Sequence, residues 1–170
     1  MTPAPRLVCK QMASPVGTLT LVAGEAGLVA ILWQDDDPAR VPLGPLADDS
    51  DHPLLLETTR QLDAYFAGAR RSFDLPLAPS GTPFQRQVWA ALLTIPYGET
   101  RSYGQLAVTL GRPGAARAVG AANGRNPLSI VAPCHRIVGG SGALTGFAGG
   151  LAAKHYLLTL ERRGAGTLLL

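Results

Sequence analysis

The sequence contains little cysteine: Cys9 and Cys134 are the only two in 170 residues. It also lacks any apolar run near the roughly 18 residues that span a bilayer. The N-terminal stretch MTPAPRLVCKQM lacks the apolar core of a signal peptide. We therefore expect a cytoplasmic protein with no membrane partner. Thiols stay reduced in that compartment, so a disulfide between the two cysteines is the less favoured interpretation.

Metal-ligand spacing is missing as well. The two cysteines and the three histidines show no pairing of the kind that a zinc site needs. We expect no metal site and no cofactor. The composition is otherwise that of a globular protein, with 46% hydrophobic and 16% charged residues. The length allows one full domain or two small ones that share an interface.

Acidic residues are scarce in one half of the chain. Residues 82–170 carry nine Lys and Arg but only Glu99 and Glu161, and nine minus two gives +7. Residues 1–81 carry six basic and ten acidic residues, which gives −4, and the two halves sum to the overall +3. A basic half favours a polyanionic partner, but charge alone fits a solvated basic surface slightly better. The arginines alone therefore do not indicate a nucleic-acid partner, and a sequence motif is needed to decide.

The first half has the pattern of strands followed by a helix. Three β-rich runs separated by turn residues predict an antiparallel meander: residues 6–12, 17–23 and 27–33. A Pro- and Asp-rich loop over residues 34–51 precedes leucines and aromatics at helical spacing in residues 52–68. Residues 71–77 are compatible with an edge strand, where Pro76 is tolerated. We expect a small α/β domain, an antiparallel sheet with a helix, over residues 1–80.

Helix signals dominate residues 81–170, which we expect to form a second, mainly α domain. Capping boxes begin two of its helices, the first at Thr82 with Gln85 and the second at Ser102 with Gln105. The second of these helices is joined to another, over residues 115–123, by a short turn of Gly and Pro. Two short helices joined in this way fit a helix-turn-helix.

The helix over residues 115–123 is built mainly of small residues. Arg117 is the only long side chain among its alanines and Gly120. Small side chains let a helix approach a groove or a phosphate chain closely, while one arginine projects into it. Tight packing of this helix against another, with Arg117 solvated, explains the same pattern equally well.

The stretch IVAPCHRIV, residues 130–138, places Cys134 beside a histidine and an arginine. A nucleophilic cysteine needs its thiolate, which a neighbouring base and a positive field favour. His135 is the candidate base, and Glu161, in a C-terminal helix that begins near Gly150, is the candidate to orient it. Adjacent side chains of an extended segment diverge, so we expect a water between thiol and imidazole. A solvated Glu161 at a helix end is the alternative.

Several spaced motifs point to one family. The signature Pro-Cys-His-Arg stands at residues 133–136, and an Asn-Pro turn begins at Asn126, eight residues before the cysteine. The stretches GETRSYGQLA and GAARAVGAANGRNP cover the two helices that fit a helix-turn-helix. Together these motifs resemble the O6-alkylguanine-DNA alkyltransferases, also called methylated-DNA–protein-cysteine methyltransferases. The similarity covers residues 82–163, whereas the N-terminal half resembles the family's small α/β domain only in pattern.

The resemblance implies a reaction and a role for each active-site residue. The reaction is direct-reversal DNA repair, an irreversible and stoichiometric transfer of the alkyl group from guanine O6 to Cys134. His135 would take the thiol proton through a water, and Glu161 would hold the tautomer of His135. Asn126 would fix the turn that holds the active-site segment. Tyr103 would donate to guanine N3 as negative charge develops there.

The resemblance also implies double-stranded DNA as the partner, bound through its minor groove by a monomer or by several molecules cooperatively. The alkylated base would be flipped out of the stack, because its O6 substituent cannot otherwise reach a buried thiol. Arg117 would occupy the vacated space. Further DNA contacts are implied for Tyr103, Gly104, Arg112, Ala116, Ala118 and Arg136.

The substrate pocket is implied at four residues: Ser129, Ile137, Phe147 and Ala148. Family members often have a Tyr-Ser pair at the last two positions, so a hydroxyl contact near O6 is missing here, and the Ala148 amide could replace it. Some members have Pro at Ser129, which leaves the range of accepted alkyl groups open.

Two other functions fit parts of the sequence. A sensor that binds alkylguanine without transfer would lack the cysteine, so Cys134 argues against it. A cysteine hydrolase using Cys134, His135 and Glu161 is disfavoured by the adjacent positions of the first two and by the small-residue helix. Turnover separates these readings, because a hydrolase acts many times and a suicide acceptor acts once.

Overall fold

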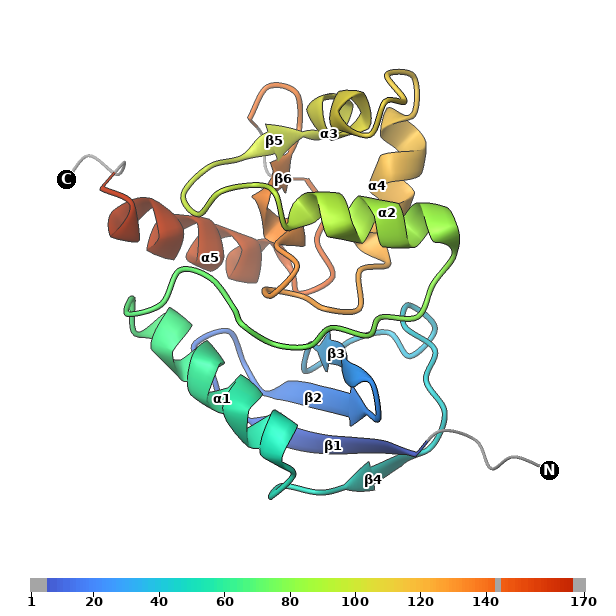
Figure 1. The fold of residues 1–170 in the computed structure, drawn as a ribbon. Coiled ribbons are helices and arrows are strands. Elements are labelled where there is room, and N and C mark those ends of the chain that lie inside the picture. The colour runs from blue at the N-terminus through green and yellow to red at the C-terminus, as the bar shows by residue number, and fades with distance from the viewer. Residues whose placement is uncertain (1–5, 143–144, 167–170) are drawn as a thin grey trace.

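The computed structural model describes residues 6–142 and 145–166, with an α/β half below a helical half in Figure 1. In the lower half, helix α1 (Pro53–Phe66) covers one face of a four-stranded sheet. The sheet order is β3-β2-β1-β4, and its strands are β1 (Leu7–Met12), β2 (Leu19–Gly24), β3 (Gly27–Leu32) and β4 (Leu46–Asp48). The fold class predicted from the sequence, an α/β half joined to a mainly α half, is confirmed.

The sheet is mixed and not purely antiparallel, which corrects one detail of the prediction. Strands β1, β2 and β3 form the expected antiparallel meander, but β4 pairs with β1 in parallel. β4 lies inside the predicted loop over residues 34–51, whose composition contains no strand signal. Pairing with the edge of β1 makes these residues extended, since strand formation depends on neighbours more than on propensity. Cys9 of β1 donates its thiol proton to Asp48 Oδ1 across this pair at 3.4 Å.

Both faces of the sheet are buried, which explains why its strands are almost continuously apolar. One face belongs to the core that includes Leu55, Leu62 and Tyr65 of α1, none of which is exposed. On the opposite face, Val22 and Ala30 pack with the partly buried Val41 and Leu43 of the loop that follows β3. The loop therefore covers the sheet in place of a second helix.

Residues 67–82 connect the two halves and run between them in Figure 1. The edge strand considered for residues 71–77 does not form. Leu28 and Leu77 make one isolated bridge, in which the Leu28 N–H donates to Pro76 O at 2.7 Å. The ladder does not extend because Pro76 has no N–H to donate.

The helical half contains α2 (Pro83–Leu92), α3 (Tyr103–Thr109), α4 (Ala116–Gly124) and α5 (Leu151–Gly164). The two predicted capping boxes begin α2 and α3, and each is complete in both directions. α3 and α4 pack against each other across the short turn between them, and their assignment as a helix-turn-helix stays a prediction. Two short parallel strands that the sequence did not predict, β5 (Arg101–Ser102) and β6 (Ile137–Val138), tie the start of α3 to the residues after the cysteine motif.

One continuous hydrophobic core joins the two halves. Backbone pairing crosses between them as well, since Ile31 bridges Leu128 and the Ile31 N–H donates to Pro127 O at 2.8 Å. The division into domains of residues 1–80 and 81–170 therefore stays a prediction. The sheet and the active-site segment behave as neighbouring parts of one packed body.

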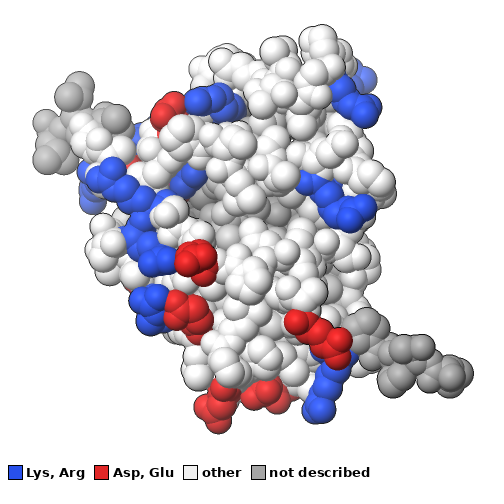
Figure 2. All heavy atoms as spheres, in the orientation of Figure 1, with Lys and Arg blue, Asp and Glu red and all other residues white. Residues whose placement is uncertain are grey.

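The balance of charge differs between the two halves on the visible surface, as it does in the sequence. On the face shown in Figure 2, acidic side chains gather on the lower, N-terminal half, and basic side chains dominate the helical half. Among the residues that the structure describes, no helix is both long and apolar enough to cross a membrane.

Candidate active site

Asn126 holds the active-site segment between α4 and α5 from inside, and it is completely buried. Its Nδ2 donates to Ala132 O at 2.8 Å, and its Oδ1 accepts from the Leu128 N–H at 3.0 Å. Between these two bonds, Ile130 has a φ of 74°. This left-handed conformation costs a β-branched residue about 1–3 kcal/mol, so the surrounding bonds maintain a strained turn. The turn immediately precedes the segment that carries Cys134.

Cys134 begins a 3-10 turn, Cys134–Arg136, and is only 5% exposed. Burial raises the pKa of its thiol, while a hydrogen bond with Asn126 and the positive charges of Arg40 and Lys154 act to lower it. Burial dominates, so the resting group is the neutral thiol. A nucleophilic role for Cys134 therefore needs a base within reach.

His135 and Glu161 form a buried pair, with 2.7 Å between Nε2 and Oε2. Burial acts to raise the pKa of Glu161, but hydrogen bonds from His135 and Arg136, together with the positive charge of Arg136, outweigh it and lower this pKa to about 2. The ionised carboxylate can only accept hydrogen bonds, so Nε2 of His135 carries the proton. Burial lowers the pKa of His135 itself, which keeps the ring neutral.

The other ring nitrogen of His135, Nδ1, is buried and has no hydrogen-bond partner among the described residues. In the tautomer that Glu161 fixes, this nitrogen carries a lone pair and is available as a base. It makes no direct hydrogen bond with Cys134. The relay of the thiol proton through a water, expected from the sequence, stays a prediction.

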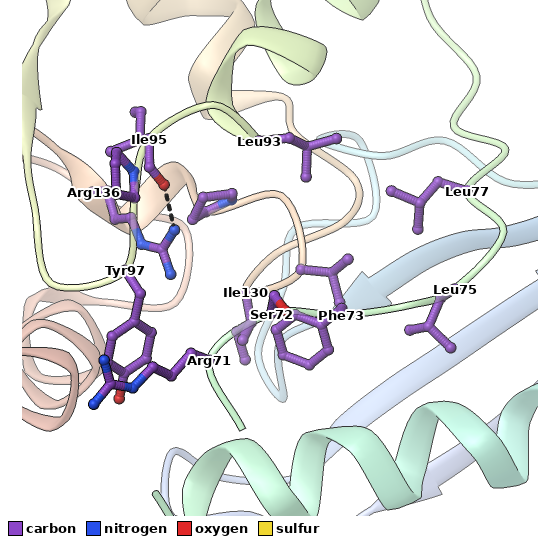
Figure 3. A pocket seen from close by; sticks show the side chains of 13 residues that line it. Arg71, Ser72, Phe73, Leu75, Leu77, Leu93, Ile95, Tyr97, Ile130 and Arg136 are labelled. Atoms are coloured by element: carbon purple, nitrogen blue, oxygen red, sulfur yellow. Dashed lines mark hydrogen bonds between the residues drawn. The ribbon is translucent and has the colours of Figure 1, made fainter. Parts of the chain in front are cut away.

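Arg136 belongs to this buried cluster, although we expected it to contact DNA. It is 7% exposed, and its Nε and Nη2 donate to the two oxygens of Glu161 at 2.7 and 3.0 Å. Its Nη1 donates to Ile95 O at 2.6 Å, the bond dashed in Figure 3. Because these donors are buried and occupied, we reassign Arg136 from the DNA surface to the positioning of Glu161.

Tyr65 joins the cluster from the N-terminal half, in which the sequence suggested no chemistry. It is fully buried in α1 and donates its hydroxyl proton to Glu161 Oε2 at 2.6 Å. Burial raises the pKa of the Tyr65 phenol, and the charge of Glu161 raises it further, so the phenol remains a donor. No sequence signal could have found this role, because Tyr65 is one aromatic residue on the apolar face of a predicted helix.

Lys154 is a second buried residue that the sequence analysis missed. It is 1% exposed in α5, with Nζ 3.5 Å from Thr145 Oγ1 and 5.8 Å from the centroid of the Phe147 ring. Burial is the larger effect on Lys154 and lowers its pKa, whereas a thiolate at Cys134 would act to raise it. A signal was present, because Lys154 stands seven residues before Glu161 and so lies on the same face of the helix.

The predicted pocket residues fall into two groups. Phe147 is half-buried and Ala148 is exposed, both in the loop before α5. Ile137 is completely buried and Ser129 is 1% exposed, and the Ser129 hydroxyl has no hydrogen-bond partner within the described part of the chain. The loop pair is therefore the part of the predicted pocket that faces solvent.

The helix pair presents the predicted DNA-contacting residues at or near its surface. Those that are exposed are Arg112, Arg117 and Ala118, and those that are half-buried are Tyr103, Gly104 and Ala116. The Tyr103 hydroxyl lies 2.6 Å from Thr145 Oγ1, which links α3 to the loop that carries Phe147. Tyr103 therefore connects the helix pair with the predicted pocket.

A cavity of about 520 Å³ lies between the active-site segment and the segment that connects the two halves (Figure 3). Its wall includes Phe73 from the connecting segment, Tyr97 from the turn after α2, and Ile130 and Pro133 from the active-site segment. Cys134 is not among the residues that line it. Within the described ranges, no group of three or more His, Cys, Asp or Glu side chains could hold a metal ion.

The site as a whole defines a class of protein. A buried cysteine with a neutral histidine and an ionised carboxylate lies in the basic half that also contains the packed helix pair α3 and α4. That arrangement is typical of a DNA-binding protein that reacts through a cysteine nucleophile.

Two family models together match nearly the whole chain. The DNA-binding domain of 6-O-methylguanine DNA methyltransferase matches residues 83–163, and the ribonuclease-like domain of the same family matches residues 7–79. The chain belongs to the 6-O-methylguanine DNA methyltransferase family, which confirms the resemblance seen in its motifs.

Named relatives and solved structures agree with this membership. The methylated-DNA–protein-cysteine methyltransferase of Mycobacterium leprae is 50% identical over 157 residues, which cover 91% of this chain and 92% of the relative. The protein of the same name from Methanosarcina acetivorans is 48% identical over 149 residues, covering 87% and 94%. The crystal structure of Mycobacterium tuberculosis OGT in complex with DNA has 46% sequence identity and a TM-score of 0.82, with 94% of each chain covered.

Proposed function

We propose that this protein repairs alkylated DNA in the cytoplasm by transferring the alkyl group from guanine O6 to Cys134, once per molecule. The observation that carries this proposal is the buried array of Cys134, His135 and Glu161. The bond between sulfur and the alkyl carbon forms as the bond between that carbon and O6 breaks. The thiol proton passes through a water to His135, and guanine leaves with the electron pair of the broken bond. The thioether does not revert, so each molecule acts once.

His135 acts as the general base from its neutral form. Its lowered pKa keeps Nδ1 unprotonated at neutral pH, and Glu161 stabilises the imidazolium that forms during transfer. Arg136 and Tyr65 keep the carboxylate ionised and oriented. General-base assistance of this kind contributes about 10²–10⁴ to the rate. Asn126 supports the array by holding the strained turn before the cysteine.

Tyr103 serves the leaving group. It begins α3, and its hydroxyl already reaches the loop before α5 through Thr145. From there it donates to guanine N3 as negative charge builds on the base, which stabilises the transition state. Phe147 and the Ala148 N–H form the near wall of the pocket, with Ser129 and Ile137 deeper inside.

Double-stranded DNA that contains O6-alkylguanine is the proposed substrate, bound by a monomer with α4 in the minor groove. Cys134 is only 5% exposed, so the target base must leave the stack to reach it. Arg117 is exposed in the first turn of α4 and takes the place of the flipped nucleotide. The small side chains of Ala116 and Ala118 allow the helix to approach the groove closely.

Intact-protein mass, before and after incubation with a duplex carrying one O6-methylguanine, tests this function. We expect a gain of one methyl group, located on the Cys134 peptide and stopping at one per molecule, and no gain for Cys134→Ser. Tight binding without a mass gain would instead indicate a damage sensor. Repaired guanine without a mass gain would indicate a hydrolase that turns over.

A further inference from the structure

Trp33, directly after β3 in the N-terminal half, lies against the loop that carries the proposed substrate pocket. It is 5% exposed, and its ring meets that of Phe147 edge to face, with 5.3 Å between centroids and 68° between planes. The same indole lies against Gly149. A methyl group added to the Gly149 Cα would come within 2.6 to 2.8 Å of the Trp33 ring atoms Cδ2, Cε2 and Cε3. The loop is therefore in close contact with the indole on both sides of Ala148.

Trp33 is itself fixed to the active-site segment. Its backbone N–H donates to Asp36 Oδ2 at 3.2 Å, and Asp36 pairs with Arg40 through two bonds of 2.7 Å. Arg40 then donates to Asn126 O at 2.8 Å and Gly124 O at 3.2 Å. The backbone of Trp33 is thus connected to Asn126, the residue that brackets the turn before the cysteine. The buried Trp33 side chain lies against the loop at Phe147 and Gly149.

The ring of Phe147 has a second neighbour, Lys154 of α5. Lys154 is buried, and its Nζ lies 5.8 Å from the centroid of the Phe147 ring. Phe147 therefore contacts both an indole from one half of the molecule and an ammonium group from the other. Any movement of the loop that widens the pocket must loosen at least one of these contacts.

We propose that Trp33 is a positioning residue that limits the size of the alkyl group accepted at guanine O6. This inference rests on the proposed function, since it concerns the pocket of that reaction. Trp33 does not reach the reacting atoms; it acts through Phe147 and Gly149, whose position sets the space above Cys134. From this role we expect a methyl group to be accepted with the loop in place, and a benzyl group to require the loop to withdraw from its present contacts.

The first test compares single-turnover rate constants for duplexes that carry O6-methylguanine or O6-benzylguanine. Trp33→Leu removes the aromatic edge, so we expect the ratio of the benzyl to the methyl rate constant to rise about fivefold, in the range of a lost aromatic pair. Leu55→Ala, a core truncation in the first turn of α1, is the matched control for lost stability and should leave the ratio unchanged. A ratio that is equal in Trp33→Leu and the wild type would overturn the proposal.

A second test examines the contact with Gly149. Gly149→Ala places a methyl group 2.6 to 2.8 Å from atoms of the Trp33 ring, which is too close, so the loop must move. We therefore expect methyl transfer to slow about fivefold. In the Trp33→Leu background the methyl group has room, and the same substitution should slow transfer less than about twofold. Equal slowing in both backgrounds would show that Trp33 does not set the loop. If Trp33→Leu does not fold, Trp33→Phe provides the smaller ring for the same comparison.

Failure of this inference is distinguishable from failure of the proposed function. A wild-type protein that gains no alkyl group on Cys134 would remove the function itself. A wild-type protein that transfers normally, with an unaltered benzyl-to-methyl ratio in Trp33→Leu, would remove only the role of Trp33.

Discussion

The two halves of the molecule contribute to the active site in different ways. The helical half supplies the reacting groups within short motifs, the Pro-Cys-His-Arg signature at residues 133–136 and the turn at Asn126. The N-terminal half supplies Tyr65, Arg40 and Trp33, which belong to no motif, and each of them contacts the active-site segment, its loop or Glu161. The residues proposed to react can therefore be found from sequence motifs. The residues that hold them in position can be found only from the tertiary fold.

The largest effect should come from the helical half. Glu161→Gln removes the charge that orients His135, so we expect methyl transfer to slow by about a hundredfold or more, with DNA affinity nearly intact. The buried guanidinium of Arg136 loses its partner, which costs about 3–5 kcal/mol of folding free energy. Single-turnover kinetics and thermal unfolding measure the two effects.

A double variant separates rate from stability in that prediction. Glu161→Gln with Arg136→Gln removes the unpaired buried charge and should regain much of the lost stability without regaining transfer. Recovery of both would mean that Glu161 acts through folding alone. Unchanged transfer in the single variant would remove Glu161 from the mechanism.

Arg117→Ala should have the next largest effect, and only on duplex DNA. Because Arg117 is proposed to fill the space of the flipped base, we expect repair of a duplex to slow about tenfold, with little change in the reaction with free O6-benzylguanine. Arg112→Ala is the matched exposed arginine, and its deficit should disappear at low salt, as for a phosphate contact. Equal loss on both substrates would contradict the flipping role of Arg117.

Tyr65→Phe tests how much the N-terminal half contributes to the active site through its hydrogen bond to Glu161, and its effect should be smaller. Loss of the bond to Glu161 should cost about 1 kcal/mol of folding free energy and slow methyl transfer by about threefold. Tyr97→Phe is the matched control, because the buried Tyr97 hydroxyl has no hydrogen-bond partner among the described residues. Denaturant unfolding and single-turnover rates compare the pair. Identical behaviour of the two variants would mean that the N-terminal half does not support the site through Tyr65.

What the sequence predicted well was local. The capping boxes at Thr82 and Ser102 depend on residues three positions apart, and they begin helices as expected. The strands of the meander follow from apolar runs separated by turns. The Cys-His-Arg signature is contiguous, so it could be found without knowledge of the fold.

What the sequence did not predict depends on distant partners. β4 and the β5–β6 pair are extended because of what lies beside them, not because of their composition. The inward orientation of Arg136 follows from the 3-10 turn that begins at Cys134, which an extended reading of the segment missed. Tyr65 meets Glu161 only through the packing of α1 against the other half.

The pH dependence of methyl transfer tests the central claim most directly. His135 has a pKa below its ordinary value of 6.5, whereas the pKa of the Cys134 thiol is raised above 9.0. A neutral base is therefore fully present at pH 7 and is lost only as the pH falls through the lowered pKa of His135. The account predicts a single-turnover rate that is constant between about pH 7 and 8.5 and declines only below about 6.5. A rate that rises about tenfold per pH unit through the same range would show attack by a thiolate formed in advance, and would contradict transfer through His135.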